Sequence, residues 1–258
     1  MKKLLFSLAA LVALASCKKE NNVNPPDPHD QPAAAKRLTN YTWSYNNQTA
    51  YENYAYDAQG RLTTVTRKLD FDEFDYSQSN MIVVTTKNIS DNSIKYHNEC
   101  NLDATGRIVK QTNYNLANVK TGIFEYVYNA DGTISKRKYI NLGANAYVSE
   151  YECTYENGNQ VLEKYYKNGI LETTTERKFD LNKPNRDPWG LFGNWPSEKW
   201  YGKGCKNVVK EFIGKKPDGS IIGHTIFSYE FDADGYPVKV IEVYPITGGN
   251  RVAFYSYE

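Results

Sequence analysis

The sequence has no excess of charge of either sign, and this excludes the simplest electrostatic partners. It holds 31 Lys and Arg residues against 30 Asp and Glu residues, a formal net charge of +1 at pH 7. Proteins that bind nucleic acid by neutralising phosphates carry a clustered basic excess. No such cluster occurs along this chain, so no nucleic-acid partner is expected.

Long hydrophobic runs are missing after residue 16. A membrane-spanning helix needs roughly 18 or more consecutive apolar residues. The one apolar run of this chain lies at residues 4–15. The remainder is therefore expected to be soluble or attached to a membrane surface.

Histidine and cysteine are too scarce for the usual catalytic and metal-binding motifs. His97 and His224 accompany no GxSxG elbow, HExxH helix or phosphate-binding loop, so no enzyme is predicted. Cys100, Cys153 and Cys205 show no CxxC or Cys/His spacing, so no metal or other cofactor is predicted. These three cysteines allow at most one disulfide, and the pairing stays open.

What the sequence does contain begins with a targeting segment. Residues 1–16 combine Lys2 and Lys3 with the apolar run, which is the pattern of a secretory signal peptide. Residues 14–17, Leu-Ala-Ser-Cys, resemble the lipobox of bacterial lipoproteins. The resemblance implies that Cys17 receives a diacylglyceryl group and becomes the new N-terminus. The alternative is an ordinary secretory signal that happens to contain a cysteine.

Residues 17–37 are predicted to be the lipidated Cys17 followed by a disordered tether. Four prolines lie among Asn, Asp and Gln between residues 20 and 35, and this composition buries too little apolar surface to fold. Lys18 follows the cysteine, where Asp would resemble an inner-membrane retention signal. The predicted location is the outer membrane, anchored by lipid, with the domain surface-exposed or periplasmic.

Residues 38–258 are predicted to form one β domain, because one turn pattern recurs along them. An apolar residue is followed by Asp, Asn or Glu and then by a turn that ends near a glycine. In such turns the polar side chain caps its own backbone, and glycine supplies the positive φ. The structural turn glycines are Gly60, Gly106, Gly132, Gly158 and Gly235. Their spacing predicts antiparallel strands of about nine or ten residues, joined in sequence order.

The predicted fold class is all-β: an antiparallel meander of β-hairpins that forms a large twisted, curved sheet or open half-barrel. The abundant tyrosines suit half-covered faces, because the ring is buried while the hydroxyl reaches water. A closed membrane barrel of fourteen or sixteen strands is the alternative with matching strand length. We disfavour it because both faces of the expected strands carry Lys, Glu or Asn, and because the chain ends in Ser-Tyr-Glu.

The turn pattern also carries a family resemblance. Residues 56–62, Tyr-Asp-Ala-Gln-Gly-Arg-Leu, resemble the YD repeats of RHS proteins, and the resemblance extends over most of residues 38–258. The chain is also similar to an uncharacterised group of bacterial lipoproteins with a lipobox, a linker and one such β domain. The resemblance implies a fold and no chemistry.

Three tryptophans in the longest irregular stretch, residues 182–206, are the candidate ligand-binding residues. Exposed indoles of Trp189, Trp195 and Trp200 would stack on sugars or anchor a protein partner. The alternative is that this Trp-rich loop covers one face of the sheet and buries them. A second cluster, at residues 70–75, has four acidic side chains but lacks the glycine and distal Glu of an EF-hand, so a solvated hairpin end is expected.

These observations predict a non-catalytic outer-membrane lipoprotein whose β-repeat domain binds a glycan or protein at the cell envelope. Its expected partners are the membrane, through the N-terminal lipid, and a polysaccharide or envelope protein. Two alternatives stay open. A surface glycoside hydrolase would need paired carboxylates, for which Glu150, Glu152 or Glu163 could serve. A carrier of a lipid or lipoprotein segment would need a large apolar groove.

Overall fold

The computed structural model describes residues 36–186, 195 and 200–258. The chain divides after Ala35, and Lys36–Glu258 form one compact unit that begins close to the predicted domain start at residue 38. The predicted signal peptide, Cys17 and most of the tether lie outside the described residues, as does Trp189. In the described part of the chain, no helix has the length and apolar character needed to cross a membrane.

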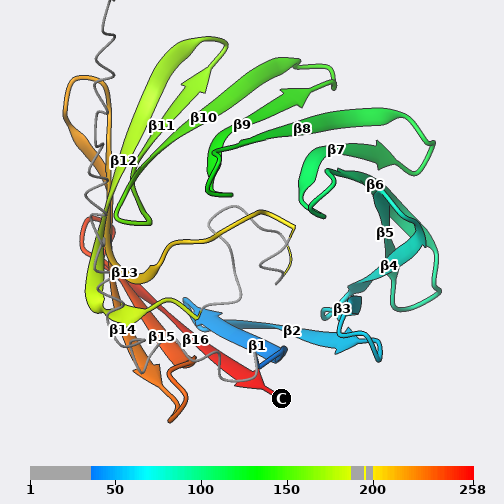
Figure 1. Ribbon diagram of the computed structural model, residues 1–258, viewed down its shortest axis with the longest axis horizontal. Coiled ribbons are helices and arrows are strands. Elements are labelled where there is room, and N and C mark those ends of the chain that lie inside the picture. Colours follow the sequence, from blue (N-terminus) through cyan, green and yellow to red (C-terminus); the bar gives the residue numbers. More distant parts are fainter. Residues whose placement is uncertain (1–35, 187–194, 196–199) are drawn as a thin grey trace, which may run out of the picture. The chain divides into compact units, whose positions relative to one another are not determined.

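Sixteen antiparallel strands follow one another around a closed barrel, and the first strand pairs with the last (Figure 1). The strands are β1 (Leu38–Tyr45), β2 (Gln48–Tyr56), β3 (Leu62–Thr66), β4 (Asp70–Gln78), β5 (Met81–Asn88), β6 (Ile94–Leu102), β7 (Ile108–Asn115), β8 (Lys120–Tyr128), β9 (Ile134–Asn141), β10 (Tyr147–Glu156), β11 (Asn159–Lys167), β12 (Ile170–Pro184), β13 (Asn207–Lys215), β14 (Ile221–Phe231), β15 (Pro237–Tyr244) and β16 (Gly249–Tyr257).

The open sheet or half-barrel predicted from the sequence is therefore wrong. The register between β1 and β16 runs from Leu38 opposite Tyr257 to Tyr45 opposite Arg251. Closure removes the two edge strands that an open meander would leave unpaired. Turn spacing and strand alternation are the same in an open meander and in a closed one, so the sequence pattern did not distinguish them.

The turns with predicted structural glycines all lie at one end of the barrel, which we call the glycine-turn end. Gly60, Gly106, Gly132, Gly158 and Gly235 have φ between 76° and 93°, the region that glycine adopts without strain. At Asp57, the backbone N–H groups of Gln59 and Arg61 donate to the carboxylate. The hairpins at the opposite end, the far end, use positive-φ asparagines such as Asn118 and Asn168.

Alternate residues along each strand face the lumen and the outside. Near the glycine-turn end the lumen is filled by an apolar core that includes Leu38, Val65, Ile82, Ile108 and Val240. The chain leading into β13, drawn in yellow, lies within the ring of strands (Figure 1). The described part of the Trp-rich loop thus lies inside a barrel and does not cover one face of an open sheet.

Candidate functional site

The segment between β12 and β13 is hydrogen-bonded to the glycine-turn end. Lys203 N donates to Gly132 O at 2.9 Å, and Lys206 N donates to Gly158 O at 2.9 Å. The carbonyl of Trp200 accepts from Ile108 N at 2.8 Å. These bonds tie the segment to three neighbouring hairpins, so the described part of it forms a floor for the lumen.

The two described tryptophans of this floor are buried among aromatic side chains. Trp195 is 4% exposed and Trp200 is 9% exposed. Phe74 packs edge-to-face against Trp195, with ring centroids 5.5 Å apart, and stacks on Trp200 at 5.6 Å. The outer surface of the barrel therefore does not present these two indoles, and any ligand that meets Trp195 meets it from within the lumen.

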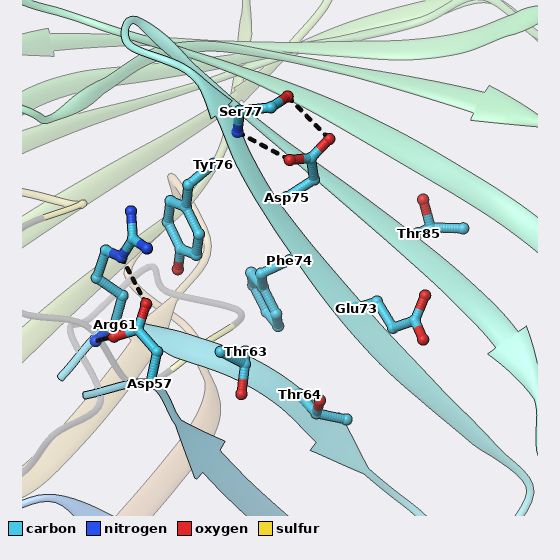
Figure 2. Close-up of a pocket in the computed structure, with 10 residues that line it drawn as sticks. All are labelled: Asp57, Arg61, Thr63, Thr64, Glu73, Phe74, Asp75, Tyr76, Ser77 and Thr85. Atoms are coloured by element: carbon cyan, nitrogen blue, oxygen red, sulfur yellow. Dashed lines mark hydrogen bonds and ion pairs between the residues drawn. The ribbon is translucent and has the colours of Figure 1, made fainter. Parts of the chain in front are cut away.

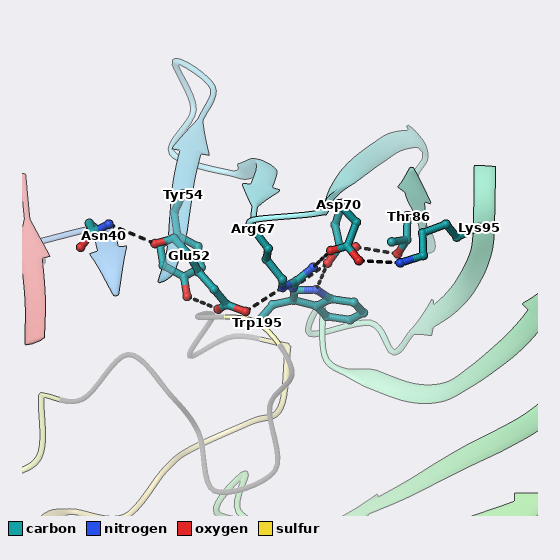
Figure 3. Close-up of polar contacts among 9 residues, drawn as sticks. Asn40, Glu52, Tyr54, Arg67, Asp70, Thr86, Lys95 and Trp195 are labelled. Carbon is teal, nitrogen blue, oxygen red and sulfur yellow. Dashed lines mark hydrogen bonds and ion pairs between the residues drawn. The ribbon is translucent and has the colours of Figure 1, made fainter. Parts of the chain in front are cut away.

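A buried carboxylate connects this floor to the barrel wall (Figure 3). Asp72 accepts hydrogen bonds from Trp195 Nε1 at 3.0 Å and from Thr86 Oγ1 at 2.6 Å. Arg67 Nη2 donates to the same carboxylate at 3.0 Å. Only 3% of Asp72 is exposed, so the expectation of a solvated acidic hairpin end is wrong for this residue. Asp72 has the same strand parity as Phe74, so alternation places it inside once the inner face of the barrel is known.

Arg67 extends the network along the wall. Its Nε donates to Glu52 Oε1 at 2.7 Å, and Glu52 also accepts a hydrogen bond from the Tyr54 hydroxyl. Burial raises the pKa of Tyr54, and the negative charge of Glu52 raises it further, so the phenol stays protonated and donates. A guanidinium that bridges two carboxylates is the arrangement in which buried charges are tolerated.

A cavity of about 730 Å³ opens above Trp195, against strands β4 to β8. Small-molecule sites typically have volumes of roughly 300–1,000 Å³. The cavity is lined by Arg67, Asp70, Asp72, Thr86, Lys95, Tyr96, Asn98, Gln111, Asn113, Tyr114, Asn115, Thr121, Phe124 and Trp195. Its acids and bases are paired, because Lys95 Nζ contacts Asp70 at 2.7 Å while Arg67 holds Asp72. None of these residues except Trp195 was singled out as a ligand-binding candidate from the sequence.

A second hollow, of about 650 Å³, lies where β3 and β4 separate (Figure 2). These strands pair only from Thr64 opposite Glu73 to Thr66 opposite Phe71. Beyond that point the Tyr76 hydroxyl donates to Leu62 O at 2.7 Å and spans the seam. Two pairs of the polar groups drawn there are in contact: Arg61 with Asp57 at 2.7 Å, and Ser77, which donates to Asp75. The cavity above Trp195 is therefore the stronger candidate site.

The two alternative functions, a glycoside hydrolase and a lipid carrier, each require an arrangement of side chains that can be compared with the structure. Glu150 and Glu152 lie on the outer face of β10, 3.2 and 3.9 Å from Lys136. Glu163 pairs with Arg177 at 3.2 Å. It is in register with Cys153 on the inner face of the wall, whereas Glu150 and Glu152 lie on the outer face. The wall thus separates Glu163 from Glu150 and Glu152, and these two acids are held by Lys136 on the outer face. The two hollows described above are lined mainly by polar side chains, whereas a lipid carrier needs an apolar groove.

The three described cysteines, Cys100, Cys153 and Cys205, are free. Cys205 Sγ accepts a hydrogen bond from Gln160 N at 3.3 Å, which helps to hold the floor segment. No cluster of three His, Cys, Asp or Glu side chains suited to a metal occurs among the described residues.

Comparisons with known proteins identify the fold. No protein-family model and no curated protein matches the chain. A porin-like protein from Bacteroides uniformis is 14% identical with a TM-score of 0.65, and the match covers 86% of this chain and 98% of that one. A porin-like protein from Bacteroides vulgatus is 11% identical with a TM-score of 0.53, over 86% and 98% of the two chains. The chain therefore has a porin-like fold.

These matches correct the family and the function expected from the sequence. The chain is a closed sixteen-stranded barrel similar to porin-like proteins, and not an RHS-type sheet of YD repeats with an exposed contact surface. The Asp-x-x-Gly turns that carried the resemblance serve any antiparallel hairpin, so they do not identify a family. An antiparallel barrel with this number of strands is an architecture of outer-membrane proteins, consistent with the outer-membrane part of the predicted location.

Proposed function

We propose that the protein is a porin-like barrel at the outer membrane whose lumen admits small hydrophilic solutes. The observation that carries the proposal is the construction of the lumen, a polar cavity of about 730 Å³ inside a closed wall. Barrels of sixteen or more strands are wide enough to leave an aqueous interior. Because the floor segment lies at the glycine-turn end, solutes enter through the far end. The proposed role is non-catalytic.

The charges on the outer face of the barrel bear on whether the barrel is embedded in the membrane. Lys110 lies opposite Glu125, Glu125 opposite Lys138, and Lys138 opposite Glu150, which makes a rung of alternating charges across four strands. Further outer pairs include Glu176 with Lys215 at 2.6 Å. A Lys or Arg on a lipid-facing strand costs about 2–4 kcal/mol near the bilayer midplane. The charges favour a wall that stands in water.

We therefore propose that the barrel is attached to the outer membrane and not embedded in it. Attachment would come from acyl chains on Cys17, with residues 18–35 as the tether, because Lys36 and Arg37 belong to the barrel unit. Two or more acyl chains anchor a protein stably, because each buried CH₂ contributes about 0.8 kcal/mol. The lumen then works as a receptacle with one accessible end.

The second candidate is a pore that spans the outer membrane. It is favoured by the strand number and by the fold of the porin-like proteins. It requires the charged rung around Glu125 to face lipid, which is its main physical difficulty.

Cysteine accessibility tests the admission of solutes. Thr173 lies opposite Tyr165 on the lumen side of β12 and is half-buried. We expect Thr173→Cys to react with small water-soluble methanethiosulfonates and to lose reactivity as the reagent grows, whereas Glu125→Cys on the outer wall reacts with every size. A lumen cysteine that even the smallest reagent cannot reach would refute the proposal.

The same outer cysteine separates the attached barrel from the spanning pore. With the lipidated protein in vesicles, Glu125→Cys is expected to react as fast as it does in detergent-free solution. Protection of Glu125→Cys by the bilayer, together with ionic conductance across it, would establish the spanning pore instead.

A further inference from the structure

We infer that one side of the outer wall docks on the lipid surface of the membrane, so that the barrel lies on strands β14 to β16. The inference deepens the proposed function, because it rests on attachment of the barrel through Cys17. Three observations carry it: an apolar patch on the outer wall, the position of this patch opposite the charged rung, and the point where the tether leaves the barrel. The contact is peripheral, and the wall as a whole is not embedded.

The patch lies on the outer face of the last three strands. Phe227, Val240 and Tyr255 pack in or against the apolar core of the lumen, so their neighbours along each strand point outwards. The outward side chains that form the apolar patch are Ile226, Ile241, Val243, Val252 and Phe254. Contiguous apolar groups on an outer surface indicate a contact with a membrane or another molecule.

The apolar patch continues from strand to strand and is uncharged at its centre. Ile226 lies opposite Val243, and Ile241 lies opposite Val252. Phe254 is 48% exposed, and Ile226 and Val243 are each 41% exposed. One rung crosses five strands without a charged residue, and it consists of Ser228, Ile241, Val252, Ser44 and Thr49.

One charge borders the apolar patch on the side of the glycine-turn end. Lys239 lies opposite Phe254 and is paired with Glu230 at 2.7 Å. A lysine at the edge of an apolar surface can keep its ammonium group in water while its stem contacts lipid. Lys239 is therefore compatible with a membrane that covers the patch.

The charged rung on β7 to β10 lies on the opposite side of the barrel. The strands follow one another around the ring, so β8 is eight positions from β16 and faces it across the lumen (Figure 1). The rung there alternates Lys110, Glu125, Lys138 and Glu150. The outer wall thus has an apolar side and a charged side. A barrel that rests on its apolar side keeps the charged side in water, where no desolvation is paid.

The tether leaves the barrel on the apolar side. Arg37 N donates to Glu258 O at 3.0 Å, and Glu258 N donates to Arg37 O at 3.0 Å, so the described chain begins beside the end of β16. A chain with the length of residues 18–35 spans at most about 60 Å. A strand of nine residues is about 30 Å long. A membrane that holds Cys17 is therefore within reach of the apolar patch, on the side from which the tether starts.

Two other occupants fit the apolar patch less well. The tether offers one large apolar side chain, Val23, in residues 18–35. A second copy of this chain would form a two-fold interface, and specific protein interfaces bury about 800 Å² per partner, from roughly 20–30 residues. The patch has five apolar side chains, each less than half exposed. A lipid surface sets no such minimum area.

Fluorescence from single labelled positions tests the inference, with the lipidated full chain in phosphatidylcholine vesicles. Ser228→Cys lies in the patch opposite Ile241, and Glu125→Cys is the matched position on the charged side. Each cysteine carries the environment-sensitive label NBD, and unlipidated Cys17→Ser protein in buffer is the reference. We expect the Ser228→Cys label to shift to the blue and to brighten by about twofold or more, as in an apolar medium. The Glu125→Cys label should do neither.

A charge placed in the patch tests the contact itself. Val243→Lys should abolish the blue shift of the Ser228→Cys label, while flotation with the vesicles, which depends on the acyl chains, is unchanged. Val127→Lys is the matched control, because Val127 is an outer valine of β8 that is 55% exposed. It should leave the shift intact. Should Val243→Lys fail to fold, Phe254→Lys takes its place with the same expectation.

The outcomes separate docking from attachment. A Ser228→Cys label that stays in water on protein that floats with the vesicles would overturn docking and leave attachment through Cys17 standing. Lipid-like emission from both labels would overturn both in favour of the spanning pore, and protein that does not float would overturn both as well. A blue shift of the Ser228→Cys label in buffer, rising with protein concentration, would replace the lipid with a second copy of the chain.

Discussion

Single side chains at the hairpin ends hold this barrel in register. Asp103 accepts hydrogen bonds from the backbone N–H groups of Thr105 and Arg107, and its carboxylate also contacts the Arg107 side chain at 2.7 Å. The backbone hydrogen bonds recur at Asp57 and Asp232, and the arginine contact recurs at Asp57 alone of these two. Such caps satisfy backbone donors that the turn would otherwise expose, so they stabilise the hairpins that define the glycine-turn end.

The stability of the barrel should therefore fall in acid. Partial burial opposes ionisation of Asp103, but hydrogen bonds from Arg107 and Thr105 outweigh it and hold the pKa of this carboxyl below its ordinary value. A lowered folded-state pKa stabilises the protein above the unfolded value, which is about 4, and this contribution is lost as the pH falls below it. We expect the urea midpoint to be constant above about pH 5 and to decrease towards pH 3.

Asp103→Asn is the matched variant for this prediction. Asn keeps the oxygen that caps the turn but does not titrate. The variant should be less stable than wild type at pH 7 and should lose less stability on acidification. Identical acid dependence in the two proteins would show that Asp103 is not among the responsible groups.

At the scale of elements, the pattern of strands and turns does not determine the conformation of the floor segment between β12 and β13. Gly202 has a φ of 70°, and a Cβ built on it would lie 2.2 Å from Gly132 O. The segment can approach the β8–β9 hairpin only because this position has no side chain. The close approach also brings Lys203 N to Gly132 O.

Gly202→Ala should accordingly loosen the floor. The strained φ and the collision with backbone together are expected to cost about 2 kcal/mol or more in the free energy of unfolding. Gly204→Ala is the control, because nothing lies within 4 Å of its built Cβ. Denaturant unfolding of both variants measures the difference, and equal midpoints would contradict the described packing of the floor.

The elements also show how far the sequence could predict this structure. Recurrent Asp-x-x-Gly turns predicted the hairpins, and the glycines they contain do adopt positive φ. These signals are local, so they carry no information on whether β1 meets β16. The burial of Trp195 likewise depends on Asp72, more than a hundred residues earlier in the chain, and no spacing within residues 182–206 encodes that contact.

The candidate site was missed for a related reason. Gln111, Asn98 and Lys95 lie on β6 and β7 as ordinary polar strand residues, without a motif. They become a site only because closure turns one strand face into a lumen. Parity could have placed Asp72 inside, but only after the inner face of the barrel was known.

At the scale of the whole molecule, the barrel carries polar groups on both faces of its wall. The lumen holds the Arg67 network and the cavity, and the outside carries paired charges such as Glu230 with Lys239 at 2.7 Å. On the proposed function, a wall of this kind needs no lipid to cover it, and the cavity in its lumen is open to water. Both properties follow from closure, and an open sheet would have neither a lumen nor a site.

Closure itself is tested most directly by a disulfide between the first and last strands. Thr42 and Phe254 are register partners, so Thr42→Cys with Phe254→Cys should form an intramolecular disulfide under mild oxidation. Lys239→Cys with Phe254→Cys, across β15 and β16, is the positive control. Mass spectrometry and non-reducing electrophoresis measure the yield. We predict equal and nearly complete formation of both disulfides. A bond that forms only in the control pair would contradict the closed barrel and the site within it.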